Sequence, residues 1–320
     1  MDVSMTGRTK SRYHAIDVIL SPAALGAEIR CGDLRHIDDT EIAEIRRAWL
    51  DHLVVIVRNQ TLTDADLVAF GQRFGEFQYT APLKNPLVVV GKVAKQGGAF
   101  PEYPEITVVS NVVENDAALG GLGDGEVIWH TDMSSFEVPP NQTILYALEI
   151  PPTGGETSFC NMYDALEALP DDLRRGIETL DLKHDDMVDA AGFVRPEYAH
   201  LVDADPSETP GAIHPLIRTH PETGRDCLYL GRRLNARVIG LPVEESDALL
   251  DRLWRHATAQ AMIWCHEWRT GDIVMWDNRC AMHRREPFDP ASRRIMHRVV
   301  VKGTPPSRQR PATGVTSSAS

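Results

Sequence analysis

The sequence lacks a long hydrophobic segment, and this absence limits where the protein can work. Within its 320 residues, no apolar run approaches the roughly 20 residues that a membrane-spanning helix needs. The first residues, MDVSMTGRTKSRYH, also lack the apolar core of a secretory signal. We therefore expect a cytoplasmic protein with no membrane partner.

Positive charge is scarce. The chain carries 33 Lys and Arg against 46 Asp and Glu, a formal net charge of −13. The field of such a protein repels phosphate backbones, and no basic stripe reverses it locally. Nucleic acid is therefore excluded as a partner, whereas an anionic substrate would need a few local arginines.

Paired cysteines are missing as well. The five cysteines are odd in number, widely spaced and free of any CxxC pair: Cys31, Cys160, Cys227, Cys265 and Cys280. This pattern is typical of reduced, buried thiols rather than of a disulfide framework. Cys280 lies three residues before His283, but a single CxxH is a weak zinc signal.

The composition of the chain and its lack of linkers predict one folded unit. Its composition, 42% hydrophobic and 25% charged, is enough to build a substantial core. The polar ends, residues 1–12 and 304–320, predict flexible tails. Because no linker and no fixed-period repeat separates them, residues 13–303 predict a single domain.

The pattern of apolar residues changes along the chain. Residues 38–52 and 64–75 have helical spacing, and residues 54–57 (VVIV) read as a strand. From residue 104 onward strands dominate, interrupted by helical insertions at about 161–180 and 243–260. Strands on either side of the insertions must pair over long distances. We expect a mixed, β-dominated fold with a double-stranded β-helix (jelly roll) core and flanking helices.

Three His-x-Asp triplets occur, beginning at His36, His130 and His184. On a strand, residues i and i+2 point to the same side, so His130 and Asp132 can reach one metal ion. The other two triplets stand in polar stretches, and we expect them in solvated surface loops. His130 instead follows Trp129 in a β-like segment after a Gly-rich loop. Its alternative reading is a core histidine.

A third ligand has to come from elsewhere, and the segment 271–303 offers His283 and His297. Two imidazoles and one carboxylate on one face of an octahedron leave three open positions. This is the ligand set of mononuclear non-haem iron(II) oxygenases.

Several motifs, in order, resemble the taurine dioxygenase and 2,4-dichlorophenoxyacetate dioxygenase family. They are WHTDM at 129–133, PPTGGETSFCNMY at 151–163, HPLIRTHPETG at 214–224, and WDNRCAMHR through RRIMHR at 276–298. The match runs from about residue 74 to residue 303. It implies an Fe(II)- and 2-oxoglutarate-dependent dioxygenase that consumes O2.

The resemblance also assigns residues. It implies that His130, Asp132 and His283 bind the iron, and that Thr157 and Arg294 bind the remote carboxylate of 2-oxoglutarate. Arginine suits this task because its planar fork matches a carboxylate. Arg298, four residues beyond Arg294 and on the same strand face, is implied to bind the substrate anion. The alternatives are a surface strand residue for Arg294 and a salt-bridged barrel residue for Arg298.

The resemblance weakens in the substrate pocket. Thr80 and Glu126 stand where taurine-specific members have His and Asn, so taurine is disfavoured. Gln78, Tyr79 and Tyr229 are candidates for the pocket border. We expect hydroxylation of a small carboxylate or sulfonate, with collapse to a carbonyl compound where the attacked carbon bears a leaving group.

Two other functions remain open from the residues alone. A zinc-dependent hydrolase could use the same three ligands, although Arg294 and Thr157 would then have no role. A non-catalytic β-barrel binding or sensor protein could retain the scaffold. By analogy with relatives, the chain could form a homo-oligomer, either a dimer or a tetramer.

Overall fold

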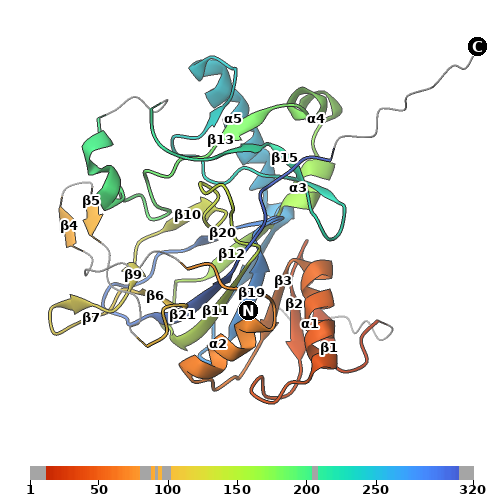
Figure 1. Cartoon of the computed structure of the whole chain (residues 1–320), viewed down its shortest axis with the longest axis vertical. Helices are drawn as coiled ribbons and strands as arrows, with labels where there is room; N and C mark the ends of the chain where they lie inside the picture. The colour runs from red at the N-terminus through yellow and green to blue at the C-terminus, as the bar shows by residue number, and fades with distance from the viewer. Residues whose placement is uncertain (1–11, 80–87, 91–92, 96–101, 204–207, 310–320) are drawn as a thin grey trace, which may run out of the picture.

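Two facing β-sheets form the centre of the molecule (Figure 1). The computed structural model describes residues 12–79, 88–90, 93–95, 102–203 and 208–309. The larger sheet has the order β1 (Asp17–Leu20), β2 (Ala27–Arg30), β3 (Val54–Val57), β19 (Ile273–Asp277), β11 (Gln142–Glu149), β21 (Ile295–Val301), β6 (Thr107–Ser110) and β9 (Gly121–Leu122). The smaller sheet has the order β10 (Val127–His130), β20 (Ala281–Arg285), β12 (Thr157–Asn161) and β18 (Ile263–His266).

The remaining strands form small accessory sheets. They are β14 (Ile213–Pro215), β13 (Asp181–Lys183) and β17 (Arg237–Val238) in one sheet, and the pairs β15 (Ile217–Thr219) with β16 (Asp226–Leu228), β4 (Val88–Val90) with β5 (Val93–Lys95), and β7 (Val113–Glu114) with β8 (Ala117–Ala118).

The larger sheet is covered on both faces, which explains its continuous apolar runs. Along β3, Val54 and Ile56 join the apolar cluster between the two sheets. Val55 and Val57 point the other way and join a second cluster that includes residues of α1 (Asp39–His52) and α2 (Asp64–Gln72). All four valine and isoleucine side chains are therefore buried.

The helices lie where the sequence predicts them. α1 begins with a capping box, in which Asp38 accepts from the Glu41 amide and Glu41 accepts from the Asp38 amide. α3 (Met162–Glu167) and α4 (Asp171–Ile177) occupy the first predicted insertion, and α5 (Val243–Ala257) occupies the second. The structure also has two short 3-10 helices, Pro196–Leu201 and Gln260–Met262. Figure 1 shows α4 and α5 at the opposite end of the molecule from α2.

Strands that are far apart in sequence pair at the centre, as a jelly roll requires. β10 pairs antiparallel with β20, and His130 lies opposite His283. β11 pairs with both β19 and β21. The predicted β-dominated fold is confirmed, and its long-range pairing is what brings the metal-ligand candidates together.

Two expectations about exposure are wrong. His36 and Asp38 are exposed as expected, but His184 is only 1% exposed. It packs against the rings of His214 and Tyr229, with centroid distances of 5.1 and 5.3 Å. The second error concerns Cys265, which is exposed. Of the other free cysteines, three are buried and one is partly buried.

The first part of the predicted C-terminal tail contacts the rest of the protein. Thr219 donates its backbone N–H to Ser307 O at 2.8 Å and accepts from the Gln309 N–H at 3.0 Å. Arg308 pairs with Asp181 at 3.3 Å. Residues 304–309 therefore pack on the body of the protein, whereas 1–11 and 310–320 lie outside the described residues. The single domain over 13–303 stays a prediction.

Within the part of the chain that the structure describes, no helix combines the length and the apolar character that crossing a membrane requires.

Candidate metal centre

The three candidate metal ligands converge inside the jelly roll. His130 is the last residue of β10, and His283 stands opposite it on β20. Asp132 lies in the turn after β10 rather than on the strand. The expectation that His130 and Asp132 share a strand is therefore wrong. The turn, in which Met133 has a φ of 49°, brings the carboxylate back towards the two imidazoles.

The distances fit three ligands around a common point. His130 Nε2 lies 3.6 Å from Asp132 Oδ1, and His283 Nε2 lies 3.9 Å from the same oxygen. One ligand atom from each residue lies within 4.8 Å of the other two, and all three residues are buried. The other candidate, His297, instead binds Asp64 Oδ1 through Nδ1 at 2.6 Å.

Protonation at the site suits metal binding. His130 Nδ1 donates to the Ile128 carbonyl at 2.7 Å, which leaves a lone pair on Nε2. Burial lowers the pKa of His283 to about 3, so its imidazole is neutral. Burial alone would raise the pKa of Asp132, but the permanent charge of Arg298 acts against it, and that pKa lies well below its usual range. Two imidazoles and one carboxylate fit Fe(II).

A chain of hydrogen bonds orients the carboxylate. Thr143 Oγ1 donates to Asp132 Oδ2 at 2.7 Å and accepts from Asn278 Nδ2 at 2.8 Å. Asn278 Oδ1 in turn accepts from Trp276 Nε1 at 3.0 Å. Because Oδ2 is occupied in this way, Oδ1 is the oxygen that faces the two histidines.

A second cluster of ligand-type residues has a structural role instead. His220, Asp277 and Cys280 lie close together, but Arg279 bonds both carboxylate oxygens of Asp277, from Nε at 2.8 Å and Nη2 at 2.7 Å. His220 Nδ1 accepts from two backbone amides. Burial raises the pKa of the Cys280 thiol well above its usual value. The carboxylate and the imidazole are thus bonded within the protein and the thiol stays protonated, which does not favour metal binding.

The two residues predicted to hold 2-oxoglutarate meet at one tryptophan. Trp268 Nε1 donates to Thr157 Oγ1 at 2.9 Å, and the Arg294 guanidinium lies 5.9 Å from the Trp268 ring centroid. Arg294 is 2% exposed and forms no ion pair with any described residue. Burial and the charge of Arg285 lower its pKa to about 9. Such an arginine is a natural partner for a carboxylate.

The turn before Thr157 lets the backbone pass close to Arg294. Gly154 and Gly155 have φ values of 79° and 74°, which few other residues adopt. A Cβ at Gly154 would meet Pro287 O at 2.8 Å. The GG of the GGET motif therefore lets the backbone approach closely beside Arg294.

Arg298 lies on the metal side of the site. Its Nη1 is 3.5 Å from Asp132 Oδ1, so its charge is next to the position where a bound substrate would react. Arg293 points away and pairs with Glu149 and Glu114 at the surface, although Arg293 and Arg294 both lie just before β21 rather than on the strand. The structure thus separates the two neighbouring arginines of RRIMHR, Arg293 and Arg294.

The residues proposed for the border of the substrate pocket differ in their exposure and contacts. Tyr229 is buried, and the Asp132 charge contributes to raising its pKa to about 12, although burial is the main cause. Tyr79 is 59% exposed, and Gln78 donates to Val138 O at 3.2 Å. Glu126 is exposed and lies 3.8 Å from Arg284, while Thr80 lies outside the described residues.

Sequence reasoning missed Arg285. It stands two residues after His283, so the strand alternation used for His130 could have found it on the same face. It is 5% exposed.

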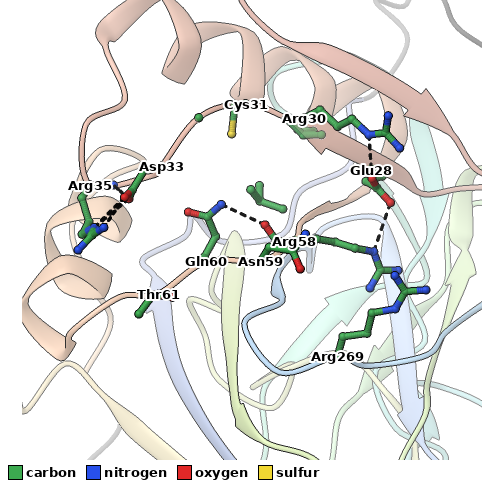
Figure 2. Close-up of a pocket in the computed structure, with 13 residues that line it drawn as sticks. Glu28, Arg30, Cys31, Asp33, Arg35, Arg58, Asn59, Gln60, Thr61 and Arg269 are labelled. Carbon is green, nitrogen blue, oxygen red and sulfur yellow. Dashed lines mark hydrogen bonds and ion pairs between the residues drawn. The ribbon is translucent and has the colours of Figure 1, made fainter.

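A cavity of about 690 Å³ lies elsewhere, at the β2–β3 edge of the larger sheet. Figure 2 shows Glu28 between Arg30 and Arg58, joined to both. Arg58 also pairs with the buried Asp272 at 2.7 Å. Since these cations are already neutralised and none of the metal-ligand candidates lines the cavity, it is not the site of the chemistry.

Comparisons with known proteins agree with this geometry. Residues 19–300 match the model of the family described as "Taurine catabolism dioxygenase TauD, TfdA family". The alpha-ketoglutarate-dependent 2,4-dichlorophenoxyacetate dioxygenase of Cupriavidus pinatubonensis is 35% identical over 83% of this chain and 90% of that protein. The pentalenolactone F synthase of Streptomyces avermitilis is 32% identical over 89% and 94%.

A solved structure of AAD-2 in complex with Mn(II) and N-oxalylglycine is similar over 92% of this chain and all of that one, with 28% identity and a TM-score of 0.71. Both the sequence motifs and the jelly-roll fold are thus shared with these proteins. The chain belongs to the TauD, TfdA family of dioxygenases, which use Fe(II), 2-oxoglutarate and O2.

Proposed function

We propose that this dioxygenase hydroxylates a small organic anion, with His130, Asp132 and His283 as the iron ligands. The observation that carries the proposal is the buried cluster itself. Its two imidazoles and its single carboxylate oxygen face one point, with distances from that oxygen to the two Nε2 atoms of 3.6 and 3.9 Å. Three ligands on one side leave positions for a chelating 2-oxo acid and for O2.

When bound, Fe(II) with 2-oxoglutarate and O2 supplies the oxidation that puts a hydroxyl on a substrate C–H carbon, with succinate and carbon dioxide as co-products. The protein's own residues bind and orient the reactants. Thr157 and Arg294 hold the remote carboxylate of 2-oxoglutarate. Their burial excludes water, which strengthens the interaction between Arg294 and a carboxylate.

Arg298 selects the substrate class in this proposal. It supplies a local cation, 3.5 Å from Asp132, in a chain of net charge −13. We infer a carboxylate or sulfonate as the substrate's anionic group. If the attacked carbon also bears an ether, amine or sulfonate, its hydroxylated product collapses to a carbonyl compound and a leaving group.

The test is succinate formation by the anaerobically iron-loaded protein after addition of 2-oxoglutarate and air. Phenoxy acids and alkyl sulfonates make up the substrate panel, and zinc-loaded protein is the control. We expect iron-dependent succinate that rises with an accepted substrate. Succinate no higher than in the zinc control, with every candidate, would rule out the proposal and favour a hydrolase or a binding protein.

Thr143→Val should weaken metal binding, because it removes the hydroxyl that holds Asp132 Oδ2 while keeping the side-chain shape. Loss of such a partner typically costs about 10- to 100-fold in metal affinity. Fe(II) affinity, measured by competition with a chelator, checks this, and Thr143→Ser is the matched control that keeps the hydroxyl. An unchanged affinity in the valine variant would show that the hydrogen bond does not orient the ligand.

A further inference from the structure

Arg285 occupies the interior next to the proposed 2-oxoglutarate site. It is the last residue of β20, two positions after His283, so its side chain leaves the strand on the same face. Across the sheet it lies directly opposite Thr157 on β12. This position places a second arginine beside the residues proposed to hold 2-oxoglutarate.

The charge of Arg285 is only partly balanced by the protein. Its Nη2 donates to the carbonyl oxygens of Leu122, at 3.1 Å, and of Gly125. These oxygens carry only partial charges, and the carboxylate of Asp124 acts on Arg285 without forming an ion pair. Like Arg294, Arg285 forms no ion pair with any residue that the structure describes. Two buried guanidinium groups without an ion-pair partner are costly, because burial of a charge is stabilised only by a partner of opposite sign.

The two arginines lie close enough for the charge of Arg285 to act on Arg294. The Arg285 guanidinium lies 5.3 Å from the centroid of the Phe288 ring. A Cβ at Gly155 would lie 3.4 Å from Phe288 Cδ1 and 3.6 Å from Arg294 Nε. The Nε atoms of Arg285 and Arg294 are both buried without a hydrogen-bond partner. Both therefore have an unused donor for an anion in this region.

We propose that Arg285 is a second binding residue for the remote carboxylate of 2-oxoglutarate, acting beside Arg294 and Thr157. The inference rests on the proposed function. One carboxylate that receives hydrogen bonds from both guanidinium groups would give the two cations a shared anionic partner. The expected consequence is strong selectivity for a 2-oxo acid with a second carboxylate over one without it.

The experiment compares two ligands on the anaerobic Fe(II)-loaded protein by calorimetry. 2-Oxopentanoate has the five-carbon chain and the 2-oxo acid group of 2-oxoglutarate but lacks the remote carboxylate. In Arg285→Gln we expect the affinity for 2-oxoglutarate to fall about 10- to 100-fold, the range for hydrogen bonds to charged groups. The affinity for 2-oxopentanoate should change by less than about 3-fold.

Two further variants act as controls. Arg284→Gln removes a neighbouring arginine whose side chain instead pairs with Glu286 and Glu126, and it should leave both affinities unchanged. Arg285→Lys keeps the cation without the planar fork that matches a carboxylate, so its affinity for 2-oxoglutarate should fall as well, by less than in Arg285→Gln, while its affinity for 2-oxopentanoate stays unchanged. It also serves as the test if the glutamine variant does not fold.

The outcomes separate the inference from the proposed function. An equal loss for both ligands in the Arg285 variants would mean that Arg285 only supports the 122–125 backbone, and it would overturn the inference. Unchanged binding of both ligands would overturn it too. If Arg294→Gln loses the selectivity and Arg285→Gln keeps it, only the role of Arg285 fails. If the wild-type protein does not prefer 2-oxoglutarate at all, the proposed function fails.

Discussion

Replacing His283 with alanine should abolish iron-dependent succinate formation, by about three orders of magnitude or more. His283 supplies one of two imidazoles, and the remaining pair, His130 and Asp132, leaves the metal on a two-residue site. Both the iron content after desalting and the rate of succinate release should fall. The loss should appear with and without a primary substrate, because succinate formation needs the bound iron in both cases.

His297→Ala is the matched control. His297 is a buried histidine of β21 whose Nδ1 binds Asp64 at 2.6 Å, and it is not part of the cluster. Its loss should cost about 1 kcal/mol of stability through that hydrogen bond, while the iron content stays near that of the wild type. An iron-loaded, active His283→Ala protein, or an iron-free His297→Ala protein, would contradict the proposed ligand set.

Local sequence signals predicted the elements of the fold well. The capping box at Asp38 and Glu41 is a contact between residues three apart, so the start of α1 can be read directly from the chain. Val54–Val57 is a short apolar run that predicts a strand, and Val55 and Val57 pack with the helices that precede and follow it. The burial of Val54 and Ile56 depends instead on the apolar cluster between the two sheets, whose residues are distant in sequence.

Burial in polar loops could not be predicted in the same way. The HDD triplet at His184 has the composition of a surface loop, yet it is covered by the rings of His214 and Tyr229. Those residues lie well beyond it in sequence, on or next to β14 and β16. Cys265 shows the converse case, because its exposure follows from the position of β18 at the edge of the smaller sheet.

The candidate metal site combines both kinds of feature. Its proposed ligands are implied by the resemblance to the family, but their approach depends on the pairing of β10 with β20 and on the turn at Met133. Neither can be derived from the spacing of His130 and Asp132. Arg285 belongs to no family motif, and although strand alternation from His283 places it on the same face, its burial without an ion-pair partner is known only from the structure.

Arg298→Ala should weaken binding of an accepted anionic substrate about 10- to 100-fold, since it removes a charged hydrogen-bond donor from a largely buried site. The 2-oxoglutarate site does not include Arg298, so succinate formation without productive hydroxylation should persist. Substrate affinity by calorimetry, and the ratio of hydroxylated product to succinate, check the two parts separately. We expect the ratio to fall more than the rate of succinate release.

The control for Arg298 compares a charged substrate with a neutral analogue. A carboxylate substrate and its neutral amide differ only at the group that Arg298 is proposed to bind, so Arg298→Ala should remove most of the wild-type preference for the acid. Arg293→Ala, which removes a surface arginine paired with Glu149, should preserve that preference. If the preference for the acid survives in Arg298→Ala, then the contact of Arg298 with Asp132 at 3.5 Å is a structural salt bridge. The anionic group of the substrate would then have to be bound by another residue.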